Sequence, residues 1–474
     1  MKKLIGREKE LEKLQRALSS NKSEFVALFG RRRVGKTFLV RSFFKNSFSF
    51  HLTGLANANT AQQLTNFFTA ILRQTSLQIQ DAPKNWFQAF QILIDLLEAD
   101  QRSGKKVVFL DELPWLDTPR SDFIMALEHF WNSWASTRDD ILLVTCGSAA
   151  SWMINNLINN HGGLHNRVTQ RIRVEPFSLA ETELLLIENG CRLDHYQIIQ
   201  LYMVMGGIPF YLEQVVPGKS AAQNIEEMCF SKDGLLVSEF DNLFNSLFRS
   251  AENYEKIIQL LATKEKGMTR SELASGKELS SGGRLSKYLK ELEESGFISR
   301  FPVFGKKKRD FVYRLTDFYS LFYLKFIQKN TNYSQGFWLS GLDLPERRVW
   351  SGRAYEQVCM THIPQIKRAL GISAVLTEHS TWQGKSSGQG AQIDLLIDRR
   401  DRVINICEIK FSMNPFTITN SYSENLRNKL GVFREVSQTR KSLFLTFITT
   451  FGIKENIHSN SLVQNSVTME AFFS

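Results

Sequence analysis

One short stretch in the first quarter of the chain has the residues needed to bind a nucleoside triphosphate. Directly after the apolar run 25–29, the chain follows the spacing Gly-x4-Gly-Lys-Thr at 30–37. Glycines allow backbone amides to turn toward phosphates, the lysine can reach the β- and γ-phosphates, and the threonine hydroxyl can hold Mg²⁺. The helix predicted to follow adds its dipole. We therefore predict an ATP site made by Gly30, Arg33, Val34, Gly35, Lys36, Thr37 and Phe38.

An acid pair farther along suits the second half of this chemistry. Asp111 and Glu112 follow the apolar strand 107–110. We expect Asp111 to contact Mg²⁺ through water and Glu112 to act as the general base that orients the attacking water. An intact glutamate at this position favours ATP hydrolysis over mere storage of the nucleotide.

Three further polar residues are candidates near the triphosphate. Ser148 follows the next apolar strand, where it either senses the γ-phosphate or belongs to a turn that caps the following helix. Arg167 and Arg171 each have two interpretations: an arginine finger or part of a basic face. The sequence alone does not decide between these alternatives.

A second set of reactive residues lies near the other end of the chain. Asp394 and the pair Glu408 and Lys410 fall on two strands joined by the charged turn DRRDR. Because side chains alternate along a strand, Glu408 and Lys410 share a face, and Asp394 can meet them across the hairpin. Two carboxylates can hold Mg²⁺ or Mn²⁺ against a scissile phosphate while a lysine stabilises the developing charge. The structural alternative is a solvated strand face, where such residues are common.

The composition constrains the protein class and its partners. The chain has 474 residues, 43% of them hydrophobic, which predicts three or four globular units. Its net charge of +11 favours a polyanionic partner, nucleic acid and in the first instance DNA. Five cysteines without CxxC pairing argue against zinc and against a disulfide framework. No apolar run is long enough for a membrane helix and the start carries no secretory signal, so we expect a cytoplasmic protein without a membrane partner.

The segment 251–330 has the pattern of a winged helix-turn-helix domain. Helical sequence with leucines at Leu285, Leu289 and Leu292 is followed by two apolar strands joined by a basic turn. In a DNA-binding version, residues 281–290 would open the recognition helix and the turn would contact phosphates. Alternatively, the domain mediates protein contact or transmits the nucleotide state. The candidate DNA contacts are Lys306, Lys307, Lys308 and Arg309.

The first half of the chain resembles the archaeal-type P-loop ATPase family, a branch related to AAA+ and STAND proteins. The resemblance rests on the order of LIGREKELEKL, FGRRRVGKT, FLDELPWL, CGS, VEPFSLAE and GGIPFYLE. It implies an ATP-binding core at 1–178 and a helical lid at 179–250. By resemblance only, Pro209 would lie near the nucleotide base and Ile5 to Arg7 would border the adenine. It also leaves open a homo-oligomer, since arginine fingers in AAA+ rings act across subunits.

The last part, 340–474, resembles the PD-(D/E)XK nuclease superfamily. The motif is Asp394, thirteen residues, then Glu-x-Lys, with Ile393 in place of the usual proline. The resemblance adds Glu356, on a helix expected at 353–370, as a further metal-binding acid. We therefore predict an α/β protein with a parallel P-loop sheet, a helical lid, a winged helix and a restriction-endonuclease-like domain. The predicted function is ATP hydrolysis coupled to DNA binding and metal-dependent phosphodiester cleavage. The alternative is a nucleotide-switched regulator whose last domain only binds nucleic acid or a protein.

Overall fold

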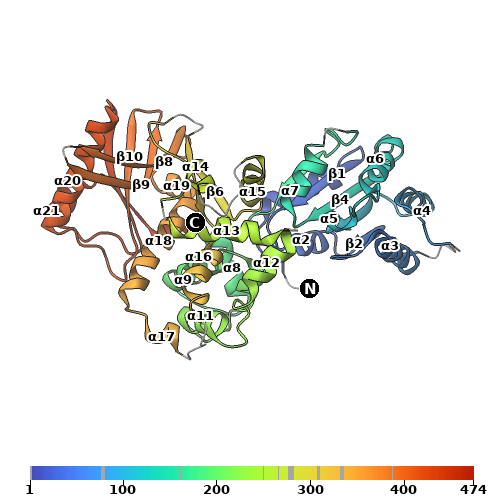
Figure 1. The fold of residues 1–474 in the computed structure, drawn as a ribbon, viewed down its shortest axis with the longest axis horizontal. Helices are drawn as coiled ribbons and strands as arrows, with labels where there is room; N and C mark the ends of the chain where they lie inside the picture. The colour runs from blue at the N-terminus through green and yellow to red at the C-terminus, as the bar shows by residue number, and fades with distance from the viewer. Residues whose placement is uncertain are drawn as a thin grey trace. The chain divides into compact units, whose positions relative to one another are not determined.

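The structure, a computed structural model, divides the chain into two compact units, Met1–Pro176 and Phe177–Ser474. Its elements are drawn in Figure 1. The lid, the winged-helix segment and the terminal region of the sequence prediction all fall in the second unit. The described residues are 3–75, 81–160, 162–248, 250–264, 266–275, 282–306, 310–330, 336–386 and 388–474.

The first unit is built on a parallel five-stranded sheet with the strand order β2-β3-β4-β1-β5. Strands β1, β3 and β4 are buried along their whole length, as expected where a sheet lies in the interior of an α/β unit. Phe29 at the end of β1 pairs with Gly147 at the end of β4, so the carboxyl ends of these strands meet at one edge. The strands are β1 (Glu24–Phe29), β2 (Phe50–Thr53), β3 (Lys106–Asp111), β4 (Ile141–Gly147) and β5 (Gln170–Arg173).

Helices surround this sheet, and an aromatic cluster fills the core. Trp86 packs edge-on against Phe123 with ring centroids 4.8 Å apart, and Phe90 stacks on Phe130 at 5.2 Å. Asn59 begins α3 with a capping box, which satisfies amides at the start of that helix. The helices are α1 (Glu8–Leu18), α2 (Lys36–Phe43), α3 (Thr60–Gln74), α4 (Trp86–Ala99), α5 (Leu113–Leu116), α6 (Phe123–Ser133), η1 (Ala135–Thr137), α7 (Ala150–Trp152) and the π-helical η2 (Met153–Ile158).

The second unit begins with helices. Gly207 has a φ of +68°, and a β-carbon there would lie 2.1 Å from the carbonyl oxygen of Phe177. The amide of Phe177 donates a hydrogen bond to the carbonyl oxygen of Gly207 at 2.7 Å, so this close approach requires glycine. The helices of this part are α8 (Leu179–Glu188), α9 (His195–Met205), α10 (Pro209–Leu212), α11 (Ala221–Phe230) and α12 (Glu239–Leu247).

Three helices and a two-stranded antiparallel sheet follow. Leu285, Leu289 and Leu292 are buried on α15, as their spacing suggested. After β6, the backbone of Val303 forms a bridge with Thr381 of the terminal sheet, and Phe304 packs on Phe433. The base of the predicted wing is therefore joined to the terminal sheet. These elements are α13 (Ala251–Thr263), α14 (Arg270–Ala274), α15 (Gly283–Glu294), β6 (Ile298–Pro302) and β7 (Phe311–Leu315).

The helix expected at 353–370 is two helices, which corrects that prediction. The first begins earlier, at Pro345, and ends at Thr361, because Pro364 near the start of the second helix cannot donate a backbone hydrogen bond within the first. The elements of this region are α16 (Phe318–Phe322), the π-helical η3 (Tyr323–Ile327), α17 (Phe337–Ser340), α18 (Pro345–Thr361) and α19 (Ile363–Ala369).

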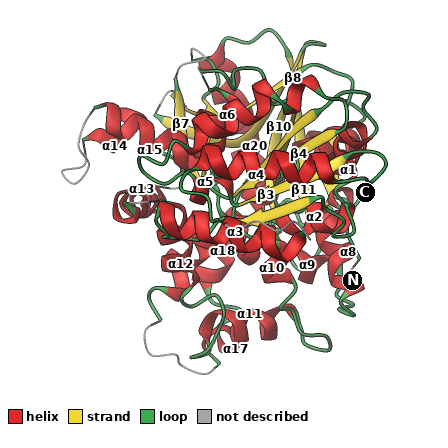
Figure 2. Ribbon diagram, turned by 90° about the vertical axis from the view of Figure 1, so that its right-hand side faces the viewer, coloured by secondary structure: helices red, strands yellow, loops and turns green. Residues whose placement is uncertain are grey.

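The terminal sheet has the strand order β12-β11-β10-β9-β8, with β8, β9 and β10 antiparallel and β10, β11 and β12 parallel. Helix α18 packs against β10, and α20 packs against β8 and β9. Figure 2 distinguishes the helices and strands by colour and labels α18, α20, β8, β10 and β11. The elements are β8 (Thr377–Ser386), β9 (Gln389–Arg399), β10 (Val403–Lys410), α20 (Asn420–Ser437), β11 (Ser442–Thr449), α21 (Ile457–Leu462), β12 (Asn465–Thr468) and η4 (Met469–Phe472).

One stretch of this sheet differs from what its composition suggests. The Gly- and Ser-rich residues after Glu378 are typical of a loop, whereas β8 continues to Ser386 and pairs with β9. Gly384 lies inside β8, where a β-carbon would meet the Trp382 ring at 2.4 Å. The small residue is thus needed for packing within a strand. Among the described residues, no helix is long and apolar enough to cross a membrane.

Candidate functional site

The phosphate-binding loop of the first unit connects β1 to α2. Gly30 has a φ of +146°, and a β-carbon at this position would lie 2.3 Å from the carbonyl oxygen of Val174. Gly35, with a φ of +88°, is the residue before α2. The buried Lys36 ammonium donates hydrogen bonds to the carbonyl oxygens of Gly30 at 3.0 Å and Arg31 at 2.8 Å. The loop thus folds around its lysine, and burial lowers the pKa of that ammonium.

The guanidinium of Arg7 links this loop to the segment after β5. Its side chain is 5% exposed, and it donates to the carbonyl oxygens of Val34 at 3.0 Å and Glu175 at 2.6 Å. Arg7 itself has a φ of +67°, a conformation that L-residues rarely adopt. These contacts give Arg7 a structural part in shaping the loop. Of the other predicted loop residues, Val34 is buried, Phe38 is 39% exposed and Arg33 has a φ of +70°.

The threonine of the loop meets the first acid of β3. Thr37 Oγ1 donates to Asp111 Oδ2 at 2.9 Å and lies 3.2 Å from Oδ1. Burial raises the pKa of Asp111, and the adjacent Glu112 carboxylate raises it further. A hydroxyl and a buried carboxylate with excess negative charge fit the hard oxygen ligands that Mg²⁺ prefers. Thr37 and Asp111 are therefore the residues that would hold the Mg²⁺ of a Mg-nucleotide.

Glu112 is held by the residue that follows β4. Ser148 donates from its hydroxyl to Glu112 Oε1 at 2.6 Å and from its backbone amide to Oε2 at 3.2 Å. Glu112 has a φ of +47°, so its backbone is also in a sparsely populated conformation. Such backbone strain, of about 1–3 kcal/mol, persists where surrounding structure holds it, often at functional sites. Ser148 thus orients the candidate general base, a partner for this serine that the sequence prediction had not considered.

The remaining nucleotide-site candidates lie in different places. Arg171 is exposed on β5, the edge strand next to β1, and Arg167 is exposed in the loop before it. Pro209 is the first residue of α10 in the second unit, directly after the close approach at Gly207. Neither arginine contacts Asp111 or Glu112 through a hydrogen bond or ion pair recorded among the described residues.

A second cluster lies within the terminal sheet and its covering helix. Cys407 pairs with Leu395 across β10 and β9, so Glu408 and Asp394 occupy the next opposing positions. Directly opposed residues share a face of an antiparallel pair. Burial raises the pKa of Glu356 on α18 to about 8, and the Asp394 carboxylate is the neighbouring charge that raises it most. The fold thus places Glu356, Asp394 and Glu408 on one side of the sheet.

Glu408 is surrounded by groups that stabilise its charge. Its oxygens accept from Lys429 Nζ at 2.5 Å and from the Tyr422 hydroxyl, and Lys410 Nζ lies 2.9 Å from Oε1. Burial acts to raise the pKa of Glu408, but Lys429 and Lys410 outweigh it and lower the pKa to about 2. Lys429 and Tyr422 were missed by the sequence reasoning. The sequence could have indicated them by their spacing. They lie seven residues apart, and thus on one face, of α20, the helix that follows Glu-x-Lys.

The three acids differ in how well they could bind a metal ion. Among the residues that the structure describes, no group of three or more His, Cys, Asp or Glu is arranged to hold a metal ion. Mg²⁺ commonly uses one or two protein carboxylates and completes its shell with water and phosphate oxygens. Glu356 and Asp394 are both half-buried and close enough to repel each other, so they fit that smaller requirement, whereas Glu408 is engaged by two lysines.

The predicted DNA contacts of the wing are only partly described. Lys306 is exposed, and its amide donates to the carbonyl oxygen of Val303 at 3.1 Å. Lys307, Lys308 and Arg309 lie outside the described residues, as does Ser281 at the start of the predicted recognition helix. Arg314 on β7, which the sequence reasoning did not single out, carries a charge that acts on Glu356 and Asp394.

Comparison with known proteins supports the first part of this description. Residues 4–215 match the family model described as an ATPase domain predominantly from Archaea. An uncharacterised protein of Methanocaldococcus jannaschii is 23% identical over 86% of this chain and 87% of its own length. An uncharacterised ATP-binding protein of the same organism is 48% identical over 42 residues, 9% of this chain and 71% of its own.

A solved structure shows a similar fold. The Walker-type ATPase of Pyrococcus abyssi, with 18% sequence identity, covers 68% of this chain and 96% of its own with a TM-score of 0.51. At this identity the likeness concerns the fold alone. Together with the geometry of Lys36, Thr37 and Asp111, the family match over residues 4–215 supports an archaeal-type ATPase domain in this part of the chain.

Proposed function

We propose that this chain hydrolyses ATP in its first unit and cleaves phosphodiester bonds of nucleic acid, with DNA the first substrate to test, in its second. The observation that carries the cleavage proposal is the assembly at the terminal sheet. Glu356, Asp394, Glu408 and Lys410 come from α18, β9 and β10, yet they converge on one side of the sheet. This convergence supports a PD-(D/E)XK-like site, and the elements α13 to β7 support a winged helix beside it.

In the ATPase site, each residue has a distinct task. The amides of the loop and Lys36 would bind the phosphates, and Thr37 and Asp111 would hold Mg²⁺, which offsets negative charge on the phosphates. Glu112, oriented by Ser148, would accept a proton from the attacking water.

In the terminal site, Glu356 and Asp394 would hold Mg²⁺, or Mn²⁺, which supplies Lewis-acid stabilisation of the scissile phosphate. Glu408 has a different role, because Lys410 and Lys429 both neutralise the charge of its carboxylate. We propose that Glu408 keeps the Lys410 ammonium in place beside the acids. Lys410 then stabilises negative charge that develops on the phosphate.

Contacts inside the second unit offer a route for coupling. Tyr196 of the lid helix α9 stacks on Phe411, the residue after Lys410, with ring centroids 4.8 Å apart. The amide of Leu179, first residue of α8, donates to His362 Nε2 at 3.2 Å, and His362 directly follows the helix that bears Glu356. A shift of α8 or α9 on ATP binding would therefore act on both sides of the terminal site.

The test is cleavage of plasmid, linear duplex and single-stranded DNA and of RNA, with Mg²⁺ or Mn²⁺ and with or without ATP. Asp394→Asn should abolish cleavage, while Asp401→Asn, an exposed carboxylate in the turn between the same strands, should leave it unchanged. Lys36→Ala should abolish ATP hydrolysis, and its cleavage rate reports the coupling. Cleavage that survives Asp394→Asn would reject the proposed site, and an unchanged rate in Lys36→Ala would reject coupling.

A second candidate function has its own supporting observation. Glu408 is 4% exposed and its oxygens are engaged by Lys410, Lys429 and Tyr422, an arrangement that a structural ion pair would also have. In that case the chain is a nucleotide-switched regulator whose terminal region only binds nucleic acid or a protein partner. Slow ATP turnover with no cleavage of any substrate would favour this function.

A further inference from the structure

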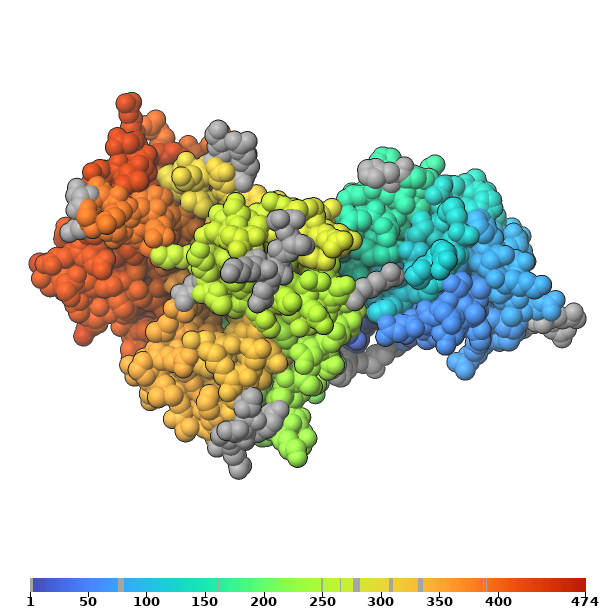
Figure 3. All heavy atoms as spheres, viewed as in Figure 1, coloured from blue at the N-terminus to red at the C-terminus, as the bar shows by residue number. Residues whose placement is uncertain are grey.

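A large cavity of the second unit opens beside the terminal acids. Its volume is about 690 Å³, and its lining comes from α9, α13, β7, α16, η3, α18 and β9. Asp394 and Glu356 border it, together with Gln392 and Gln357. The green, yellow and orange segments that contribute to this lining abut each other in Figure 3. The cavity is thus formed only where the predicted lid, winged-helix and terminal segments come together.

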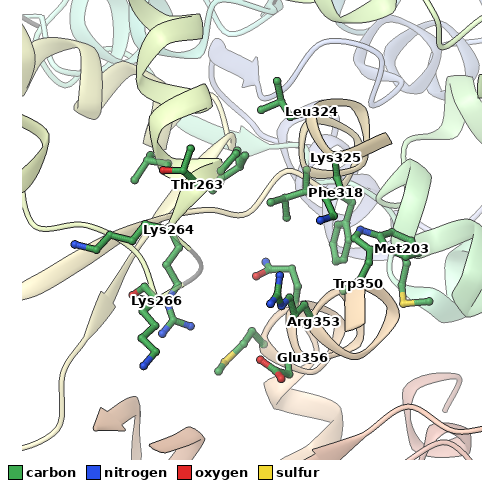
Figure 4. A pocket seen from close by; sticks show the side chains of 18 of the residues that line it. Met203, Thr263, Lys264, Lys266, Phe318, Leu324, Lys325, Trp350, Arg353 and Glu356 are labelled. Atoms are coloured by element: carbon green, nitrogen blue, oxygen red, sulfur yellow. Dashed lines mark hydrogen bonds between the residues drawn. The ribbon is translucent and has the colours of Figure 1, made fainter. Parts of the chain in front are cut away.

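The lining of this cavity has more basic than acidic side chains, although Lys264 is paired with Glu272 and Lys325 with Glu346 just outside it. Among the described residues that line it, six are basic and only Glu356 and Asp394 are acidic. Figure 4 shows Lys264 and Lys266 across the cavity from Lys325 and Arg353, with Glu356 next to Arg353. Basic residues on opposing walls attract a chain of phosphates rather than a single charge. The six basic residues are Lys264, Lys266, Arg314, Lys325, Lys329 and Arg353.

One helix supplies both a basic and an acidic residue to the cavity. Trp350, Arg353, Gln357 and Met360 recur at helical spacing on α18, and Glu356 lies on the same helix beside them. Arg314 on β7 also lines the cavity, close enough to the acids that the charges of Glu356 and Asp394 act on its guanidinium. Arg353 and Glu356 are one helical turn apart on α18. A phosphate bound by Arg353 would therefore lie near the carboxylates that we propose for phosphodiester cleavage.

The size of the cavity restricts what can enter it. Cavities of about 300–1,000 Å³ take ligands of drug-like size, comparable to one or two nucleotides. A duplex does not fit inside the cavity, because a volume that holds one or two nucleotides has no room for two paired strands. About half of the lining is apolar, including Phe318 and Trp350, which suits bases better than an inorganic anion.

We infer that this cavity binds the end of a single-stranded nucleic acid and directs its backbone to Glu356 and Asp394. The inference rests on the proposed cleavage function for its direction and names the substrate of that site. It differs from the recognition helix and the basic turn of the wing as a DNA-binding surface, because the basic residues it uses lie on β7, η3 and α18 and directly after α13 and η3. A free nucleotide has the same phosphate and base chemistry and is the competing occupant.

The test measures binding of a fluorescently labelled dT12 strand to the full chain in EDTA, so that cleavage cannot interfere. The double variant K266A/K325A removes one lysine from each wall, and K385A/K454A removes two exposed lysines elsewhere. Removing two phosphate contacts lowers the salt slope by about 1.4, since each contributes about 0.7 for a single strand. Raising salt from 50 to 200 mM should therefore weaken the wild type about sevenfold more than the cavity variant, with no such difference for the control.

Neutralising both acids gives a second, opposite readout. Without metal, the negative charge shared by Glu356 and Asp394 repels the phosphates, so the double variant E356Q/D394N should bind dT12 severalfold more tightly in EDTA. Unchanged affinity and slope in K266A/K325A would overturn the inference. So would duplex binding with the same dependence on these lysines, or AMP binding to a Lys36→Ala chain that is as tight as dT12 binding. If binding of the single strand depends on the cavity lysines but the strand is never cleaved, this inference stands and the cleavage proposal is refuted.

Discussion

The hydroxyl of Ser148 offers a sharp test of how the ATPase site works. Ser148→Ala removes its hydrogen bond of 2.6 Å to Glu112 Oε1 but leaves the backbone amide, 3.2 Å from Oε2, in place. Hydrogen bonds to charged groups contribute about 1.5–3 kcal/mol. Because the amide continues to hold the carboxylate, we take the lower end, about 1.5 kcal/mol. A loss of that size in transition-state stabilisation lowers kcat about tenfold.

The assay is steady-state ATP hydrolysis together with the equilibrium affinity for ATP. Since Glu112 acts on the attacking water, kcat should fall while the affinity stays unchanged. Ser151→Ala is the matched control, because the Ser151 hydroxyl is buried three residues later and has no hydrogen-bond partner among the described residues. An unchanged kcat in Ser148→Ala would refute the positioning role. A raised kcat would show instead that Ser148 withholds Glu112 from the water.

Three further predictions concern the second unit. Burial lowers the pKa of His362 to about 4, below its usual 6.5. The folded state therefore resists protonation of this ring, and its full stability is present only above pH 6.5. Urea unfolding should show that the free energy of unfolding falls by about 3 kcal/mol as the pH falls from 6.5 to 4, and this loss should be absent in His362→Gln. Gly207→Ala should cost more than about 2 kcal/mol in the same assay, since its β-carbon would overlap the Phe177 carbonyl at a φ of +68°. Lys429→Met should destabilise by about 1–3 kcal/mol by leaving the buried Glu408 with less compensation, whereas Lys429→Arg should retain most of the stability.

The nucleotide site could be located from sequence because its parts are local. Strand, glycine turn and helix follow each other within a few residues of Lys36, and a buried parallel strand delivers Asp111 to the same sheet edge. The opposition of Asp394 and Glu408 was predictable for a similar reason, since a hairpin fixes its own register.

Other parts of the site depend on packing that the sequence does not display. Lys429 reaches Glu408 only because α20 folds back over the sheet. The charge of Arg314 acts on Glu356 because the end of β7 lies near α18, where Gln357 donates to the carbonyl oxygen of Thr316. Similarly, the Gly-rich stretch around Gly384 has loop composition, but its small residue accommodates the Trp382 ring inside a strand. Tertiary contact overrides local preference in each case.

Two contacts limit which part of the chain can be inherited or engineered as one piece. They are the stacking of Tyr196 on Phe411 and the hydrogen bond from the Leu179 amide to His362. The family match ends at residue 215, inside the second unit, whereas the compact units meet between Pro176 and Phe177. A fragment cut at the end of the match would expose the ring of Tyr196 and leave the Leu179 amide without its histidine. The segment that sequence comparison treats as a portable module therefore includes helices whose folding partner is the terminal region. An exchange of terminal domains between such ATPases would have to carry α8 to α12 along with it.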